Sequence, residues 1–387
     1  MGTNRRAILS GNNGDTKVVR GTIMSLSKTI RLSKAVLGTY FKKPIAGPYS
    51  VYLGITDRCN YQCVFCKYDH FHKDFINDSK KTLPFHLIKQ CIQDLGEMVT
   101  QHINFLSWVQ PFTHPDILEI LAEVKKNRMT MGLLTNGYKL SKDIVDKLLA
   151  LRLDALGISL NAASGETYEK LHLNQPARTF NKIKNNLLYL NEEKRKRHIK
   201  YPILSVSFVI TTINYKDIEN MVRLTKEVGG EKINFENVRI YSPDKEYLKL
   251  NKSQLEEVAV EFNRLKTNAS LEFSFKNFSF NTNGMMPDIG NSQLPDNCYA
   301  GYVGPTGISP DGSIRFCCAC GIPVGTLYEK NFMDIWHDSL MQKYREKGRQ
   351  MWREKEGLLG DCCHRCADAD IYNRIHNKFH FWQKSKK

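Results

Sequence analysis

The chain has 387 residues, 41% of them hydrophobic, which is enough for a sizeable core in more than one domain. It contains no uninterrupted apolar run of the roughly eighteen residues that a membrane span needs, and its N-terminus lacks the compact apolar segment of a secretory signal. We therefore expect neither a membrane-spanning nor a secreted protein. The formal net charge of +16 suits nucleic acid, an anionic membrane surface or an acidic protein partner.

The eleven cysteines include several in ligand-like spacings, which favours bound metal over disulfides and predicts a cytoplasmic protein in a reducing compartment. The charge is unevenly spread. Residues 1–50 hold five Lys and four Arg against one Asp, whereas the run from Glu192 to Lys200 mixes both signs. We interpret that mixed run as a solvated helix end.

The first 22 residues are rich in Gly and Asn around positions 11–14, which predicts a loosely attached tail. From Ile23 to Phe41 apolar residues recur at helical spacing with basic residues between them. This pattern predicts an amphipathic helix that caps one end of the following domain. A helix lying on a membrane surface is the alternative, although the apolar stripe is thin.

The most informative stretch runs from Ile55 to Tyr68, where Cys59, Cys63 and Cys66 are separated by three and then two residues. One short loop can thus aim three thiolates at three irons of a four-iron cubane. The next cysteine, Cys91, lies in an apolar run with the spacing of a buried helix face, so no nearby thiolate is offered to the fourth iron. That iron is left open for a small-molecule ligand. A zinc site is the alternative, but zinc usually takes two separated pairs of ligands.

With Phe65 just before the last cysteine, this motif resembles that of the radical S-adenosylmethionine (SAM) enzymes. The resemblance implies a 4Fe-4S cluster whose open iron binds the amino and carboxylate groups of SAM. It also implies that one electron from the cluster splits SAM into methionine and a 5'-deoxyadenosyl radical, and it places Phe65 among the cofactor-binding residues. A thiolate-held cluster suits this task because its potential can be set very low.

After Pro48 the chain alternates between strand and helix patterns. The expected strands are Val51–Thr56, Ile103–Trp108, Thr130–Thr135, Ala155–Leu160, Leu204–Thr211 and Lys232–Phe235, and the expected helices are Phe85–Val99, Asp116–Asn127, Ser141–Leu151, Phe180–Glu193 and Asp217–Val228. Such alternation implies parallel pairing with right-handed crossovers. The units resemble the partial (βα)6 TIM-type barrel of radical SAM enzymes, an α/β fold with its cofactors at the C-terminal ends of the strands.

Further positions at strand ends match this family. Asn136 stands in a Thr-Asn-Gly turn after the third strand, and Ser159 and Asn161 end the fourth strand. The resemblance implies that these side chains reach SAM, at its ribose or carboxylate in the case of Ser159 and Asn161. Alternatively, Asn161 caps the helix that begins near Ser164.

One segment departs from the family pattern. After the second strand the family usually has Gly-Gly-Glu-Pro, whose Glu holds the amino group of SAM, whereas this chain has Ser107 to Pro111 with Gln110 in place of the Glu. Gln110 can accept a hydrogen bond but lacks the negative charge that favours an ammonium. We expect Gln110 to contact SAM, and the exchange leaves the SAM affinity open.

Beyond residue 280 the composition shifts to Gly, Pro and Cys. Cys298, Cys317 and the C-x-x-C pair of Cys363 and Cys366 have a spacing that resembles the SPASM/twitch auxiliary-cluster domains of radical SAM enzymes. The resemblance implies a second 4Fe-4S cluster with these four ligands, two on a hairpin that turns at residues 309–312 and two on a later loop.

Three more cysteines, Cys318, Cys320 and Cys362, have no assigned role. A full SPASM domain holds two auxiliary clusters and needs cysteines beyond the C-x-x-C pair, so we expect one auxiliary cluster. A structural zinc site on the same four thiolates is the alternative.

These features divide the chain into a basic N-terminal tail and helix (1–47), a radical SAM partial barrel (48–280) and a small Cys-rich auxiliary-cluster domain (281–387). The resemblance implies an enzyme of the oxidoreductase or isomerase type that cleaves SAM reductively and abstracts hydrogen from its substrate. We favour a small polyol or aminosugar, oxidised or epimerised, because the segment before the barrel is short for a leader-peptide-binding domain.

Two alternatives stay open. One is a peptide-modifying radical SAM maturase, and the other is a non-catalytic iron-sulfur electron carrier, which the altered segment at 107–111 motivates. Besides the substrate, the expected partner is an acidic electron donor such as a flavodoxin or ferredoxin. We expect neither nucleic acid nor a membrane surface as a partner. The sequence identifies no general base and no oligomeric state.

Overall fold

The computed structural model describes residues 34, 37–38, 41–66, 81–105, 110–266, 271–276, 298–318, 321–354 and 363. The expected tail at 1–22 lies outside the described residues, as does most of the expected helix from Ile23 to Phe41. Its described positions, Lys34, Leu37, Gly38 and Phe41, are helical.

The fold is organised by one ten-stranded sheet in the order β10-β9-β8-β1-β2-β3-β4-β5-β6-β7. The strands are β1 (Ser50–Leu53), β2 (His102–Phe105), β3 (Thr130–Thr135), β4 (Ala155–Ser159), β5 (Ile203–Ile210), β6 (Lys232–Asn237), β7 (Glu272–Lys276), β8 (Thr306–Ile308), β9 (Ser313–Arg315) and β10 (Pro323–Thr326). Strands β1 to β7 pair in parallel, so the predicted α/β fold with a parallel sheet is confirmed. The seventh strand, β7, extends the sheet beyond the predicted strands. Within the described residues the sheet is open, with β7 and β10 at its edges.

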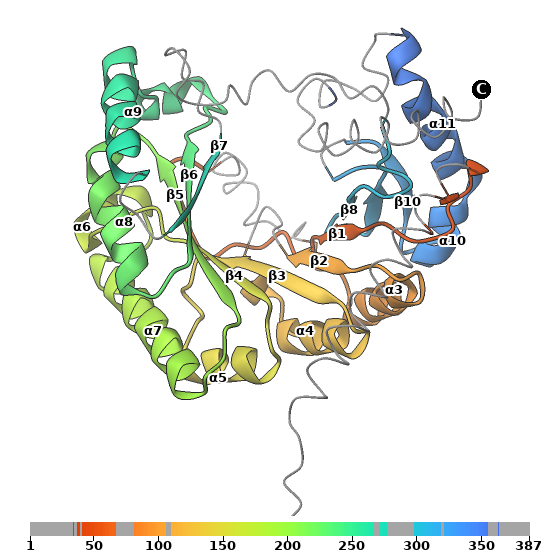
Figure 1. Cartoon of the computed structure of the whole chain (residues 1–387), viewed down its shortest axis with the longest axis horizontal. Helices are drawn as coiled ribbons and strands as arrows, with labels where there is room; N and C mark the ends of the chain where they lie inside the picture. The colour runs from red at the N-terminus through yellow and green to blue at the C-terminus, as the bar shows by residue number, and fades with distance from the viewer. Residues whose placement is uncertain are drawn as a thin grey trace, which may run out of the picture.

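The helices that follow the strands cover the outer face of the curved sheet (Figure 1). They are α3 (Phe85–Glu97), α4 (Ile117–Lys126), α5 (Lys142–Ala150), α6 (Gly165–Leu171), α7 (Ala177–Lys196), α8 (Ile218–Glu227) and α9 (Lys252–Lys266), with short 3-10 helices η1 (Pro111–Thr113), η2 (Tyr215–Asp217) and η3 (Pro243–Leu248). The predicted helices correspond to α3, α4, α5, α7 and α8, and α6 begins at the expected helix start near Ser164, whereas α9 is missing from the prediction. None of the described helices combines the length and apolarity needed to cross a membrane.

The two faces of the sheet differ in chemistry. Along β5, Leu204, Val206 and Phe208 are buried under the helices, and the alternating Ser205 and Ser207 are only partly buried on the inner face. Side chains on a strand alternate between faces, so this pattern marks the outer face as the core and the inner face as less buried, with two serines between Ile203 and Val209. Parallel sheets are usually apolar on both faces. The inner face, with its hydroxyl groups, is therefore the surface available for cofactor and substrate.

The C-terminal part of the chain continues the same sheet. Strand β8 pairs in parallel with β1, with Val51 opposite Thr306, and β8, β9 and β10 then pair as antiparallel neighbours. Two further helices, α10 (Phe332–His337) and α11 (Ser339–Glu354), follow. Backbone pairing therefore runs across the expected boundary at 281, and the domain boundaries stay a prediction.

Helix α10 packs on α3 of the barrel through buried polar contacts. The Asp94 carboxylate, on α3, accepts hydrogen bonds from Gln90 Nε2 at 2.9 Å and from the Met333 backbone N–H at 3.3 Å. Trp336 Nε1–H donates to the Ala46 carbonyl at 3.1 Å. These contacts fasten the C-terminal part to the first β-α unit.

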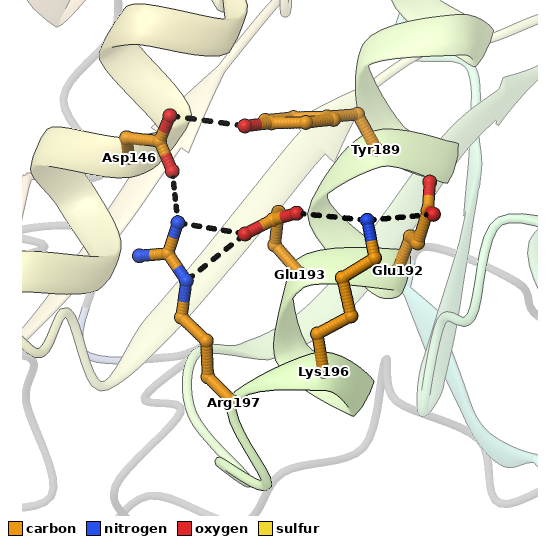
Figure 2. A network of polar contacts seen from close by, with 6 residues as sticks. All are labelled: Asp146, Tyr189, Glu192, Glu193, Lys196 and Arg197. Atoms are coloured by element: carbon orange, nitrogen blue, oxygen red, sulfur yellow. Dashed lines mark hydrogen bonds and ion pairs between the residues drawn. The ribbon is translucent and has the colours of Figure 1, made fainter.

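The mixed charged run ends α7, and Figure 2 shows how its side chains pair. Arg197 bonds Glu193 of its own helix at 2.7 Å and also reaches Asp146 of α5. Tyr189 donates to the same Asp146 carboxylate at 3.0 Å, and Lys196 pairs with Glu192 at 2.8 Å. The partly exposed run is a helix end held against α5, as the mixed signs indicate.

Replacing Asp94 by alanine tests whether α3 holds the C-terminal part in place. We expect Asp94→Ala to lower the free energy of unfolding by about 1–3 kcal/mol, because the variant leaves a half-buried backbone N–H without its acceptor. Urea unfolding measures the change. As a control, Asp143→Ala removes an exposed i,i+4 pair with Lys147 on α5 and should cost about 0.5 kcal/mol or less. Equal losses in the two variants would contradict the role of Asp94.

Candidate active site

The loop that carries the cysteine triad follows β1 at the C-terminal edge of the sheet. Cys59, Cys63 and Cys66 are half-buried, and the Cys66 N–H donates to the Cys63 carbonyl at 3.0 Å, which closes the end of the loop into a turn. Cys91, in contrast, is fully buried on α3. Burial raises the pKa of its thiol well above the usual value, so Cys91 is a packing residue, as predicted.

A second segment, residues 171–175 at the end of α6, holds this loop in place. The Val64 N–H donates to the Leu171 carbonyl at 3.0 Å and the Leu173 N–H to the Gln62 carbonyl at 2.9 Å, which makes a short antiparallel bridge between Cys63 and His172. We call residues 171–175 the cradle. It fixes the backbone of the middle of the triad.

Side chains of the cradle complete the contact. Asn174 accepts from the Gln62 N–H at 2.9 Å and donates to the Asn60 carbonyl at 3.0 Å. Gln175 Nε2 donates to the same carbonyl at 3.3 Å. These residues are missing from the sequence-based site, because more than a hundred positions separate them from the loop that they hold.

The surroundings of Cys63 are aromatic, with His172, Tyr61 and Tyr168 buried. His172 Nδ1 lies 3.1 Å from Cys63 Sγ, and the imidazole is enclosed by the rings of Tyr61, Phe65 and Tyr168 with centroids 5.2, 6.0 and 4.4 Å away. Burial lowers the pKa of His172 to about 4. Burial also raises the pKa of both tyrosines, with the nearby Cys63 thiolate adding to the rise, so their hydrogen-bonded hydroxyls stay neutral.

These surroundings fit an iron-sulfur cluster. Among the described residues no three His, Cys, Asp or Glu side chains converge as ligands of a single metal ion would. A cubane makes no such demand, because each thiolate binds a different iron. No disulfide joins the described cysteines. Three half-buried thiols on one rigid loop therefore suit a cluster with one open iron.

A chain of amides links the loop to the strand ends beside it. Gln110, which is 3% exposed and follows β2, donates through Nε2 to Asn136 Oδ1. Asn136, in the turn after β3, donates to Asn60 Oδ1 at 3.0 Å. The expected residues Gln110 and Asn136 are thus brought together, with Asn60 as a third member that the sequence analysis lacks. Ser107 to Val109 lie outside the described residues.

The two ends of this amide chain are buried and have no hydrogen-bond partner in the described part of the protein. They are Gln110 Oε1, an acceptor, and Asn60 Nδ2, a donor. Buried polar atoms are nearly always paired, so such atoms call for a ligand. An amino acid offers an amine to the acceptor and a carboxylate to the donor. The arrangement fits the methionyl end of SAM.

Ser159 and Asn161 lie together at the end of β4. Asn161 is 1% exposed and has φ +62, and its amide accepts from the Val209 N–H at 3.0 Å and donates to Ser159 Oγ at 3.1 Å. The helix α6 is capped by Ser164, which accepts from the Thr167 N–H at 3.2 Å. The alternative that Asn161 caps this helix is therefore wrong. Asn161 joins β4 to β5, and the half-buried Ser159 is the more accessible of the two side chains.

In the chain, the hairpin of β8 and β9 lies between the expected auxiliary ligands Cys298 and Cys317. The predicted turn at 309–312 is confirmed, with the Gly312 N–H donating to the Ser309 carbonyl at 2.9 Å and Gly312 at φ +79. Cys298 and Cys363 are buried, and Cys317 and Cys318 are half-buried. Cys320, Cys362 and Cys366 lie outside the described residues, so the fourth expected ligand is not placed.

Helix α11 positions Cys298. The Cys298 N–H donates to the Gly348 carbonyl at 2.9 Å, and a Cβ at position 348 would lie 3.1 Å from Cys298 Cβ. One turn earlier, the buried Arg345 donates to the carbonyls of Gly301 and Trp336. Glycine at 348 thus permits the close approach of helix and cysteine. Neither Gly348 nor Arg345 is part of the site predicted from the sequence.

A curved parallel sheet with a thiol-bearing loop at its C-terminal edge, beside orphaned amides suited to an amino acid, defines a class of iron-sulfur enzyme that uses SAM. Comparison with known proteins agrees. The radical SAM superfamily matches residues 53–225, and the SPASM iron-sulfur cluster-binding domain matches residues 298–367. The chain belongs to the radical SAM superfamily and carries a C-terminal SPASM domain. The radical SAM domain binds SAM and the 4Fe-4S cluster that cleaves it, and the SPASM domain binds auxiliary iron-sulfur clusters.

Individual relatives are distant. The chain is 25% identical over 203 residues to a tungsten-containing aldehyde ferredoxin oxidoreductase cofactor-modifying protein of Pyrococcus furiosus, covering 50% of this chain and 52% of that protein. It is 22% identical over 319 residues to the PqqA peptide cyclase of Granulibacter bethesdensis, covering 78% of this chain and 77% of the relative. The chain spans about half the length of the first of these relatives.

Solved structures share the fold. Streptococcus suis SuiB bound to precursor peptide SuiA superposes with a TM-score of 0.57 at 16% identity, covering 93% of this chain and 84% of that one. The anSMEcpe structure with AdoMet and the Kp18Cys peptide gives a TM-score of 0.55 at 13% identity, covering 84% and 88%. These similarities confirm the architecture.

Exchanging Gln110 tests the amide chain as a SAM contact. We expect Gln110→Ala to weaken SAM binding about tenfold, which corresponds to one lost hydrogen bond of about 1.4 kcal/mol. Calorimetric titration of SAM into the anaerobic reconstituted protein measures the change. The control is Gln101→Ala, which alters a glutamine at the opposite end of β2. An unchanged affinity in Gln110→Ala would remove this residue from the site.

Exchanging Gly348 tests the contact with Cys298. A methyl at position 348 would press on the Cys298 backbone and Cβ, so we expect Gly348→Ala to lose iron from the auxiliary site while the SAM-sensitive signal persists. Iron analysis and electron paramagnetic resonance (EPR) measure both. Gly321→Ala, where an added Cβ meets no atom within 4 Å, should keep its iron. Full iron content in Gly348→Ala would show that α11 does not position Cys298.

Proposed function

We propose that this enzyme modifies a peptide or a peptide segment of a protein by radical chemistry. The observation that carries the proposal is the match to the PqqA peptide cyclase, because it spans 78% of this chain and so includes both the barrel and the SPASM domain. The SuiB structure with its bound precursor peptide has the same architecture. These relatives favour the peptide alternative over the small polyol or aminosugar expected from the sequence.

The inner face of the sheet supports a polar, extended substrate. Asn234 of β6 donates to Ser207 Oγ of β5 at 3.2 Å, and both side chains are only partly buried. Peptide backbones present alternating donors and acceptors, which such hydroxyl and amide groups can satisfy. The substrate would lie along this face, next to SAM at the strand ends.

We assign the following roles to the chain's residues. Cys59, Cys63 and Cys66 hold the cluster, Gln110 and Asn60 orient the methionyl end of SAM, and Asn136 keeps those two amides aligned. Bound there, the cofactors would supply a 5'-deoxyadenosyl radical, the chemistry needed to take a hydrogen atom from an unactivated C–H bond. The protein contributes position and exclusion of water.

At the second site, Cys298, Cys317, Cys363 and Cys366 would hold an auxiliary 4Fe-4S cluster, which would supply an electron acceptor or a binding point for the substrate. Whether the net reaction is oxidation, epimerisation or crosslinking would depend on whether that site accepts an electron from the substrate radical. Low-potential electrons would come from an acidic flavodoxin or ferredoxin, which suits the net charge of +16. We place this reaction in the reducing cytoplasm.

The test compares two panels of substrates with reconstituted enzyme, SAM and dithionite. One panel holds synthetic 20-residue peptides that together present every side chain, and the other holds polyols and aminosugars. We expect a peptide to raise 5'-deoxyadenosine formation at least tenfold over the substrate-free rate and to change mass by the abstracted hydrogens.

The other outcomes decide between the alternatives. Stimulation by a polyol or aminosugar alone would establish the small-molecule hypothesis. Formation of no 5'-deoxyadenosine under any condition, with both clusters present, would favour the electron carrier.

A further inference from the structure

His172 makes a contact that the loop geometry does not require. Its backbone already bridges to Cys63, and its side chain then turns back so that Nδ1 lies 3.1 Å from Cys63 Sγ. The imidazole is 0% exposed and is held between aromatic rings, of which Tyr168 is the nearest at 4.4 Å between centroids. The ring therefore cannot turn its nitrogen away without repacking the aromatic cluster.

The chemistry of the sulfur decides which atom carries the proton. A thiolate bound to iron has no hydrogen, so it can only accept, and the Nδ1 that faces it must donate. The other ring nitrogen, Nε2, lies 3.5 Å from the Leu160 carbonyl, which is at the outer limit of a hydrogen bond. A neutral imidazole has one N–H. We place it on Nδ1, because the contact with the iron-bound thiolate is the shorter of the two.

We propose that His172 is a positioning residue that donates its Nδ1–H to the Cys63 thiolate and so stabilises the reduced state of the SAM-binding cluster. Reduction adds one electron, and the sulfurs share the extra negative charge, so an N–H···S bond strengthens when the electron arrives. Hydrogen bonds to cluster sulfurs are among the factors that set reduction potentials. His172 thus raises the midpoint potential toward the range that a cellular donor can reach.

A purely structural role predicts different behaviour. If His172 only filled space among the rings, a phenyl ring would serve as well, and the potential would not depend on the N–H. The inference rests on Cys63 being a cluster ligand, which is part of the proposed function, but it does not depend on the identity of the substrate.

The experiment is an EPR-monitored redox titration of the holoenzyme, following the signal that changes when SAM is added. His172→Phe keeps a ring but removes the donor, and His172→Asn keeps an N–H donor close to the position of Nδ1. We expect a lower midpoint potential in His172→Phe and a potential near that of the wild type in His172→Asn. The auxiliary cluster in the same samples should be unaffected.

Tyr168→Phe is the matched control. It removes the hydroxyl that bonds Tyr61, within the same aromatic cluster, and leaves the N–H···S contact intact. We expect its potential to match the wild type. An unchanged potential in His172→Phe, or equal shifts in all three variants, would overturn the proposal in favour of packing.

A measurement on the wild-type protein tests the hydrogen bond even if the variants lose the cluster. With 15N-labelled histidine, pulsed EPR of the reduced SAM-binding cluster should detect one coupled histidine nitrogen and one exchangeable proton. Their absence would contradict the hydrogen bond. If the SAM-sensitive signal persisted in Cys63→Ala, the ligand assignment itself would fail, which is a separate outcome from a failure of the His172 proposal.

Discussion

Everything at this site depends on holding three thiolates on a short loop at fixed positions. The loop from Cys59 to Cys66 is too short to form a core of its own, so its shape must come from contacts elsewhere. The cradle at 171–175 supplies them through backbone pairing on both sides of Cys63 and side-chain bonds to Asn60 and Gln62. Rigid support of this kind is what a preorganised site requires.

The same contacts connect the cysteine loop to the amide chain. Asn60 is held by the cradle through its carbonyl and meets Asn136 through its side chain. The loop, the β3 turn and the segment after β2 therefore act as one unit, with Gln110 at its far end. The amide chain fixes the orientation of Gln110, which stands where the family has a glutamate, and leaves its buried carbonyl oxygen for the ligand proposed above.

The C-terminal part is built into the barrel rather than appended to it. Strand β8 extends the sheet beside β1, the strand that leads into the cysteine loop, and α10 packs on α3. The auxiliary site thus has a fixed relation to the first β-α unit. Such coupling suits the reaction proposed above, in which the auxiliary site takes part.

Local patterns carried the part of the fold and site that could be predicted from the sequence. The three cysteines of the triad lie close together in the sequence, and strands β1 to β6 alternate with amphipathic helices. The sequence therefore predicts both. Helix α9 has a signal that was available, since Asn251 and Gln254 form a reciprocal capping box. The cradle, β8 and Gly348 have no such signal in the local sequence. Each contacts partners that lie about 50 to 250 positions away, and tertiary packing determines which residues those are.

The most direct test of the account compares the wild type with the triple variant Cys59→Ala, Cys63→Ala, Cys66→Ala under anaerobic conditions. Iron and sulfide contents and Mössbauer and EPR spectra are measured for both, with and without SAM. The account predicts about eight irons in the wild type and about four in the variant, as two four-iron clusters require, with a SAM-induced spectral change in the wild type alone. About four irons in the wild type and none in the variant would contradict the auxiliary cluster. A SAM-sensitive signal that survives in the variant would contradict the account at its centre.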